Sequence, residues 1–190
     1  MVTISNDAAQ LIRSGFVRVD PLTGAAHVLV LPRNPATLSR ALVSTPNAEG
    51  TGEPREQISF VLMLEAIPAG TDQLGIYPLL SALELLLYLP SAPPPVLLFV
   101  WGSRRILPVR VIELHVKEQL FDDVLTPTQA ELAVTLQVLK KADLAAGTFG
   151  REQWELHLAI MQQLASALPL AELSDLGLGG LDLGARREHL

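Results

Sequence analysis

The segment from Val96 to Leu139 constrains the fold most, because it carries two different β-strand patterns. Residues 96–101 form an unbroken apolar run, which is typical of a strand buried on both faces. Residues 131–139 instead alternate apolar and polar side chains, which indicates a strand with one buried face and one wetter face. We therefore predict a mainly β protein.

The apolar residues between these two strands change parity. Val109 and Val111 occupy odd positions, whereas Ile112, Leu114 and Val116 occupy even ones. Because side chains alternate strictly between the faces of a strand, this change predicts a bulge, a bend, or a strand that leaves one packing layer for another. Such strands suit a sheet that closes, or one that extends past its domain to meet a neighbour.

Length and charge limit the classes of protein that this chain can represent. With 190 residues it can form one main domain with a short appendage. The net charge of −6 opposes nucleic-acid binding, and the pairs Arg104–Arg105 and Lys140–Lys141 do not make a basic stripe. The absence of cysteine excludes disulfides, thiolate metal sites and a cysteine nucleophile.

Two helices are expected beside the strands. The segment 76–89 is apolar well beyond one stripe, so we expect it to be sandwiched or covered by another subunit. Glu84 and several prolines interrupt the hydrophobic stretch 79–101, which argues against a membrane span. We predict three parts: a β domain over 1–145, an amphipathic helix over 151–170 and a Leu/Gly-rich tail, extended or flexible, over 171–190.

Further strands are expected nearer the N-terminus. Residues 15–20 and 26–31 flank a turn from Pro21 to Gly24, which predicts a hairpin. Alternation from Ile58 to Leu64 predicts a strand with one firmly buried face. The polar segment 44–56 is interpreted as a mobile surface loop.

Residues that could carry chemistry are sparse, and we predict no catalytic residue, no cofactor and no metal site. The four histidines at positions 27, 115, 157 and 189 lie on different expected elements. Asp122 and Asp123 could form a carboxylate pair for acid–base chemistry, but adjacent carboxylates in a turn more often end a strand. Trp101 could stack a ligand, although a place in the core is the simpler interpretation.

Several segments together carry a resemblance to a known family. In chain order they are Arg55–Phe60, Gly75–Pro78, Pro93–Pro95, Leu98–Gly102, Leu107–Arg110, Glu118 with Phe121–Asp122, and Leu125–Pro127 with Ala130–Glu131. Over about Gly15 to Asp143 the chain resembles the tube-type domain of contractile injection systems. It is most similar to the baseplate component that lies between inner tube and central spike in phage-tail-like particles.

The resemblance implies a tail-tube-like β-barrel or sandwich protomer that forms a ring of copies of itself, with six copies expected. The implied partners are the inner tube protein, the spike or hub protein and other baseplate proteins, with no nucleic acid and no membrane insertion. Assembly is implied in the cytoplasm, followed by incorporation into a contractile particle, which can be extracellular. Relatives often carry a peptidoglycan-binding LysM module after this domain; here a helix from Arg151 and the tail occupy that place.

The resemblance also implies roles for individual residues, which we state as hypotheses. Interface residues are expected at Leu83, Leu86, Leu87, Phe121, Asp122 and Leu125. Residues facing the lumen or a rim are expected at Glu131, Thr135 and Gln137. By pattern alone the latter could equally lie on the outer face of a monomeric sandwich. The competing interpretation is a small ligand-binding β domain with a pocket near Trp101 and the 76–89 helix, with an enzyme a distant third.

Overall fold

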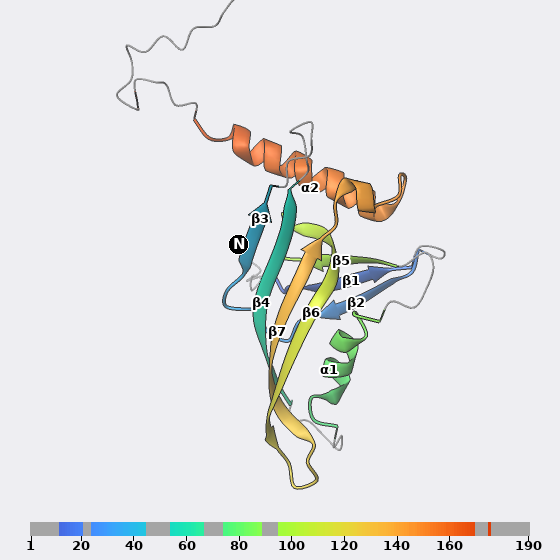
Figure 1. Cartoon of the computed structure of the whole chain (residues 1–190), viewed down its shortest axis with the longest axis vertical. Helices are drawn as coiled ribbons and strands as arrows, with labels where there is room; N and C mark the ends of the chain where they lie inside the picture. Colours follow the sequence, from blue (N-terminus) through green and yellow to red (C-terminus); the bar gives the residue numbers. More distant parts are fainter. Residues whose placement is uncertain are drawn as a thin grey trace, which may run out of the picture. The chain divides into compact units, whose positions relative to one another are not determined.

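The computed structural model describes residues 12–20, 24–44, 54–66, 74–88, 95–169 and 175. Their strands form one seven-stranded antiparallel sheet in the order β2-β1-β5-β6-β7-β4-β3 (Figure 1). The elements are β1 (Gly15–Val19), β2 (Ala26–Val30), β3 (Ser39–Val43), β4 (Arg55–Glu65), α1 (Tyr77–Glu84), β5 (Val96–Val100), β6 (Ile106–Phe121), β7 (Pro127–Val138), a 3-10 turn η1 (Lys141–Asp143) and α2 (Phe149–Ser166). The prediction of a mainly β protein with an internal helix and a C-terminal helix is confirmed.

The sheet is not closed into a barrel, which corrects the barrel expectation for the single protomer. Closure would need β2 to pair with β3, but among the described residues β2 pairs only with β1 and β3 only with β4. The sheet bends instead, so that β1, β2 and β5 run across the direction of β4 and β7 (Figure 1). This bend brings Phe60 of β4 against Phe99 of β5, with ring centroids 5.4 Å apart, although the two strands are not neighbours.

The predicted change of parity in β6 is a β-bulge. Val111 pairs with Leu136 of β7, and Glu113 pairs with the preceding residue of β7, Thr135, so that Ile112 is the extra residue. Val111 is buried before the bulge, and Leu114 returns to the core side after it. Bulges increase local twist and bend a strand. The bulge therefore lets one strand join the two directions of the sheet.

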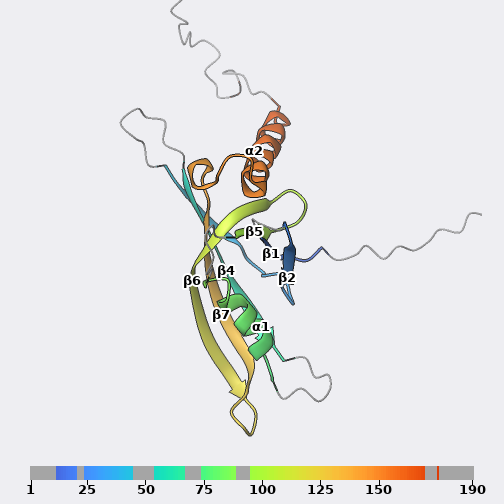
Figure 2. The same cartoon turned by 90° about the vertical axis from the view of Figure 1, so that its right-hand side faces the viewer.

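The core lies between the bent sheet and α1 (Figure 2). Phe99 is fully buried and contacts three aromatic rings, those of Phe16 at 5.5 Å, Phe60 at 5.4 Å and Trp101 at 5.9 Å between centroids. Helix α1 contributes two buried leucines, Leu80 and Leu83. Trp101 is partly buried against this core, as the simpler interpretation of its sequence position predicted.

Both helices differ in extent from the expectations. Helix α1 ends at Glu84, short of the expected residue 89, because Leu86 and Leu87 donate backbone hydrogen bonds to the carbonyls three residues before them. Such bonds tighten a helix end into a 3-10 turn. Helix α2 begins at Phe149, two residues before the expected start, after Thr148, whose carbonyl accepts the N–H of Glu152.

The remaining expectations are met in part. The hairpin of β1 and β2 is confirmed, although residues 21–23 of its turn lie outside the described residues. The expected loop 44–56 is shorter, since Arg55 and Glu56 belong to β4, and residues 45–53 also lie outside the described residues. Of the tail 171–190 only residue 175 is described. The chain divides into two units, Met1–His157 and Leu158–Leu190, and the site below lies in the first.

Candidate functional site

One face of β4, β6 and β7 points away from the core and carries mostly polar side chains. We call it the polar face, and it comprises Gln57, Ser59, Val61, Met63, Glu65, Arg110, Glu113, His115, Lys117, Gln119, Gln129, Glu131, Ala133, Thr135 and Gln137. The three residues predicted for a lumen or rim, Glu131, Thr135 and Gln137, all lie on it. The sequence signal that located them is their alternation with the buried residues of β7, which are Leu132, Val134 and Leu136.

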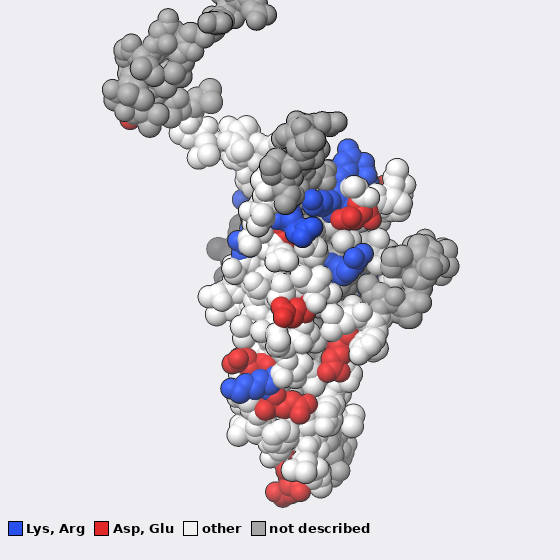
Figure 3. All heavy atoms as spheres, viewed as in Figure 1, with Lys and Arg blue, Asp and Glu red and all other residues white. Residues whose placement is uncertain are grey.

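Contacts across the polar face are mixed in charge. Glu131 lies opposite Lys117 in the register, and Glu113 receives a hydrogen bond of 3.3 Å from the hydroxyl of Thr135. The same Glu113 carboxylate lies 2.8 Å from the Nε2 atom of His115. Figure 3 likewise shows small groups of acidic and basic side chains separated by uncharged surface. This arrangement suits contact with water or polar partners and lacks the single-sign field that steers a charged ligand.

The tip of the β6–β7 hairpin, residues 120–125, combines a tight turn with exposed apolar side chains. The Asp122 carboxylate accepts hydrogen bonds from the backbone N–H groups of Val124 at 2.9 Å and Thr126 at 2.7 Å. These bonds, that of Thr126 first, hold the pKa of Asp122 below its ordinary value. This is the turn-forming role that sequence analysis favoured over acid–base chemistry.

The apolar residues of the tip are unusually accessible. Leu120, Phe121, Val124 and Leu125 are 67%, 51%, 72% and 76% exposed. Leu120 and Leu125 also have positive φ values, of 44° and 65°, a conformation that leucine adopts at a cost. Among the predicted interface residues, the tip residues Phe121 and Leu125 are therefore open to a partner.

The predicted interface residues of α1 lie in a different environment. Leu83 and Leu86 are only 2% and 8% exposed and belong to the protomer's own core. Leu87 is 41% exposed. Leu83 and Leu86 thus hold α1 on the sheet, and only Leu87 of this group presents a large surface to another molecule.

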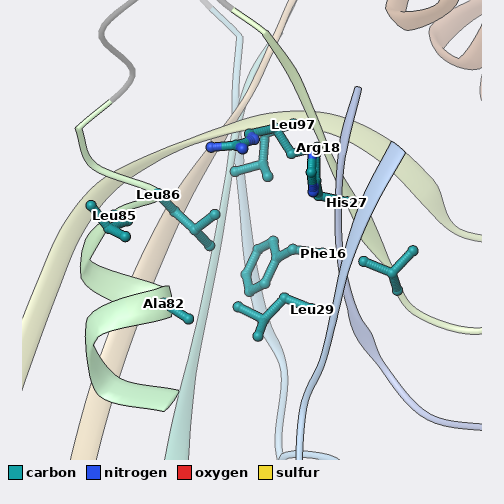
Figure 4. Close-up of a pocket in the computed structure, with 9 residues that line it drawn as sticks. Phe16, Arg18, His27, Leu29, Ala82, Leu85, Leu86 and Leu97 are labelled. Atoms are coloured by element: carbon teal, nitrogen blue, oxygen red, sulfur yellow. The ribbon is translucent and has the colours of Figure 1, made fainter. Parts of the chain in front are cut away.

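A pocket of about 240 Å³ lies beside the C-terminal end of α1 (Figure 4). Its lining residues are Phe16, Arg18, His27, Val28, Leu29, Ala82, Leu85, Leu86 and Leu97. Arg18 and His27 face each other across β1 and β2. The pocket adjoins α1, but Trp101, near which the competing interpretation expected it, is not among the lining residues. No sequence pattern marks the pocket, since it depends on how α1 meets two distant strands.

A second cavity, of about 510 Å³, lies where β1, β5 and β6 meet the segment that leads into α2. Its lining is largely apolar, with Arg110 and Asp143 among its charged members. Among the residues that the structure describes, no group of three or more His, Asp or Glu side chains could hold a metal ion. Neither α1 nor the described α2 combines the length and hydrophobicity that crossing a bilayer requires.

His157 is a buried polar residue that sequence analysis placed in no site. It is 9% exposed, and neither ring nitrogen has a hydrogen-bond partner among the described residues. The Arg104 backbone lies near enough to favour the protonated ring, and so to raise the pKa of His157 slightly. Burial lowers its pKa, the Glu56 carboxylate opposes this shift, and the guanidinium groups of Arg40 and Arg105 add to it. Arg40 and Glu56 themselves form an ion pair at 2.6 Å.

The lowered pKa of His157 predicts a loss of stability in mild acid. Below the ordinary value of 6.5 the unfolded chain takes up a proton that the folded ring resists, so the free energy of unfolding should fall as pH drops from 6.5 towards the lower folded pKa. Urea unfolding at pH 7.5 and pH 5.5 measures this dependence. His157→Leu should reduce the loss between the two pH values, and an unchanged loss in that variant would assign the effect to other groups.

Comparison of the chain with protein-family models finds no match, and comparison with curated proteins finds none either.

Proposed function

We propose that this chain is a structural, non-enzymatic ring component of a contractile injection system that joins the inner tube to the central spike hub. The observation that carries the proposal is the ordered resemblance over Gly15–Asp143. Its segments fall on successive elements: Arg55–Phe60 begins β4, Gly75–Pro78 opens α1, and Leu98–Gly102 ends β5. Leu107–Arg110 lies in β6, and Pro127 begins β7.

The polar face supports a place around a channel. Strands β4, β6 and β7 contain 11, 16 and 12 residues, so each extends for roughly 35–50 Å at about 3.3 Å per residue. A ring of such protomers needs one face of its strands towards an aqueous lumen and the other towards a core. In this arrangement Glu131, Thr135 and Gln137 would line the lumen or its rim.

The open sheet supports pairing between copies. Strands β2 and β3 form the two edges, and each has backbone groups that no neighbouring strand of the described sheet takes up. Exposed edges of this kind pair readily with another chain, and two different edges allow head-to-tail assembly that closes into a ring. The barrel missing from one protomer could then be completed by several copies, with the inner tube, hub and other baseplate proteins as further partners.

Electron microscopy of this chain co-expressed with the tube and spike proteins encoded beside it tests the proposal. We expect a ring of the chain at the spike-proximal end of the tube. Leu42→Lys, a charge on the exposed side chain of edge strand β3, should reduce ring formation several-fold, while Leu42→Ala should not. Circular dichroism of both variants checks the fold. Tubes and spikes that assemble without this chain would refute the proposal.

The pocket beside α1 favours a second candidate, a small ligand-binding β domain. Its lining is largely apolar, and Arg18 and His27 could orient an anionic group. The smallest probe of this chemistry is an aromatic carboxylate such as benzoate. Saturable binding of benzoate that raises the melting temperature of the wild-type protein and is lost in Arg18→Ala would support this candidate, and a melting temperature that benzoate leaves unchanged would oppose it.

A further inference from the structure

We propose that the hairpin tip of one copy, residues 120–125, inserts into the pocket beside α1 of a second copy. The two surfaces match in size, hydrophobicity and charge. The contact adds a second point of attachment between neighbouring copies of the proposed ring. It rests on the proposed function only for the closure of the copies into a ring. The contact between two copies can be measured on the chain alone.

The tip has the character of a surface made for contact. A hairpin turn in water is usually built from small polar residues, yet this one exposes four large apolar side chains. Two of them, Leu120 and Leu125, occupy the left-handed region that glycine or asparagine would occupy without comparable strain. Strained residues that persist in an exposed segment are typical of binding sites.

The pocket has room for one side chain of the tip. Its volume is about 240 Å³. A cavity of about 150 Å³ is large enough to bind benzene. The pocket could therefore receive the ring of Phe121 or the side chain of Leu125, and its walls of Phe16, Leu29 and Leu97 are apolar (Figure 4).

Charge supports the same pairing. The pocket is lined by the cationic Arg18 and by His27, which lie opposite each other in neighbouring strands. The tip carries two adjacent carboxylates, and Asp122 is already bonded to backbone N–H groups of the turn. Asp123 is exposed and lies within the turn itself. We therefore assign Asp123 as the partner of Arg18.

The tip of the same copy cannot reach this pocket. The N–H of Ile76, at the start of α1, donates a hydrogen bond of 3.1 Å to the carbonyl of Pro127, at the base of the tip. The pocket lies at the opposite end of α1, beside Leu85 and Leu86, and both Figures 1 and 2 show the tip beyond the start of the helix. The contact is therefore between copies, and because the tip and the pocket are different surfaces of the chain, it can repeat head-to-tail around a ring.

Disulfide trapping tests the contact cleanly because the chain has no cysteine. We would mix full-length Leu125→Cys with affinity-tagged Ala82→Cys, at a position of α1 that faces the pocket (Figure 4), and oxidise with oxygen and copper-phenanthroline. Each disulfide releases two protons and passes two electrons to oxygen. We expect a heterodimer whose yield exceeds several-fold that of Leu125→Cys mixed with Val61→Cys. Val61 is an exposed control position on the polar face.

Charge reversal adds a second measurement. Arg18→Glu, introduced into the Ala82→Cys chain, should lower the heterodimer yield several-fold, and Asp123→Arg in the Leu125→Cys chain should restore it. Leu125→Gly in an otherwise unchanged chain should abolish concentration-dependent association in sedimentation while leaving the melting temperature at or above that of the wild type. Equal trapping at Ala82 and Val61 would overturn the inference, as would failure of the charge reversal to restore the yield.

The two proposals fail in different ways. Specific trapping at Ala82 together with particles that lack this chain would refute the proposed function and leave the contact standing. Rings at the end of the tube without trapping at Ala82 would refute the contact and leave the proposed function standing.

Discussion

Replacement of Phe99 by alanine is expected to lower the free energy of unfolding by about 3–5 kcal/mol, the cost typical of removing a buried aromatic ring. Phe99 is fully buried and contacts Phe16, Phe60 and Trp101, with centroid distances of 5.4 to 5.9 Å. These partners come from β1, from β4 and from the residue that follows β5. Loss of the ring would thus leave a cavity where the two directions of the bent sheet meet.

Urea unfolding followed by far-UV circular dichroism measures the effect of Phe99→Ala. Val61→Ala is the matched control, because Val61 lies on the polar face and is 46% exposed. That control should cost less than about 1 kcal/mol, as is usual for surface positions. A Phe99→Ala variant as stable as Val61→Ala would mean that the aromatic cluster does not join the two parts of the sheet.

Replacement of Gly75 by alanine is expected to cost about 3 kcal/mol, the sum of two effects. Gly75 has a φ of +55°, and a Cβ atom there would approach the carbonyl oxygen of Pro127 to 2.2 Å. That carbonyl also accepts the N–H of Ile76, which opens α1. Alanine therefore adds the strain of a left-handed residue, about 1–2 kcal/mol, to the loss of a buried hydrogen bond, about 1 kcal/mol or more.

Gly24→Ala separates these two contributions. Gly24 has a similar φ of +70°, but no atom of the described residues lies within 4 Å of the position that an alanine Cβ would take, so only the backbone strain of about 1–2 kcal/mol is expected. Thermal or urea unfolding of the two variants gives the difference. Equal losses of unfolding free energy in the two variants would show that α1 can shift away from β7 without cost. The pocket beside the C-terminal end of α1 would then not have a fixed shape.

Local patterns were enough to predict every strand except β3, whose five residues show no clear alternation of apolar and polar side chains. The shift of apolar residues between odd and even positions in β6 predicted a bulge, a bend or a change of packing layer, and the register with β7 shows a bulge at Ile112. Alternation likewise located the buried side of β4, with Ile58 and Phe60 inward. The α1 start at Tyr77 was signalled by proline in the first turn and a run of leucines behind it.

The candidate site was less accessible to sequence reasoning. Glu131, Thr135 and Gln137 could be assigned to one face by period, yet their neighbours on β4 and β6 are known only from the pairing register. Leu83 and Leu86 were expected at an interface because α1 is apolar on several sides. The bent sheet encloses them, since it curves around the helix and supplies core contacts on more than one side.

The positions of the main strands, the buried side of β4 and β7, and the bulge in β6 all follow from short stretches of sequence, because they depend on the two-residue period of the pleat and on a few neighbours along the chain. Three other features emerge only when the chain is folded: the sheet stays open, α1 and two distant strands leave a pocket, and His157 is buried near Arg40 and Arg105. These features depend on the twist and bend of the whole sheet. The twist accumulates from one strand pair to the next, and the resulting shape brings residues far apart in the chain into contact.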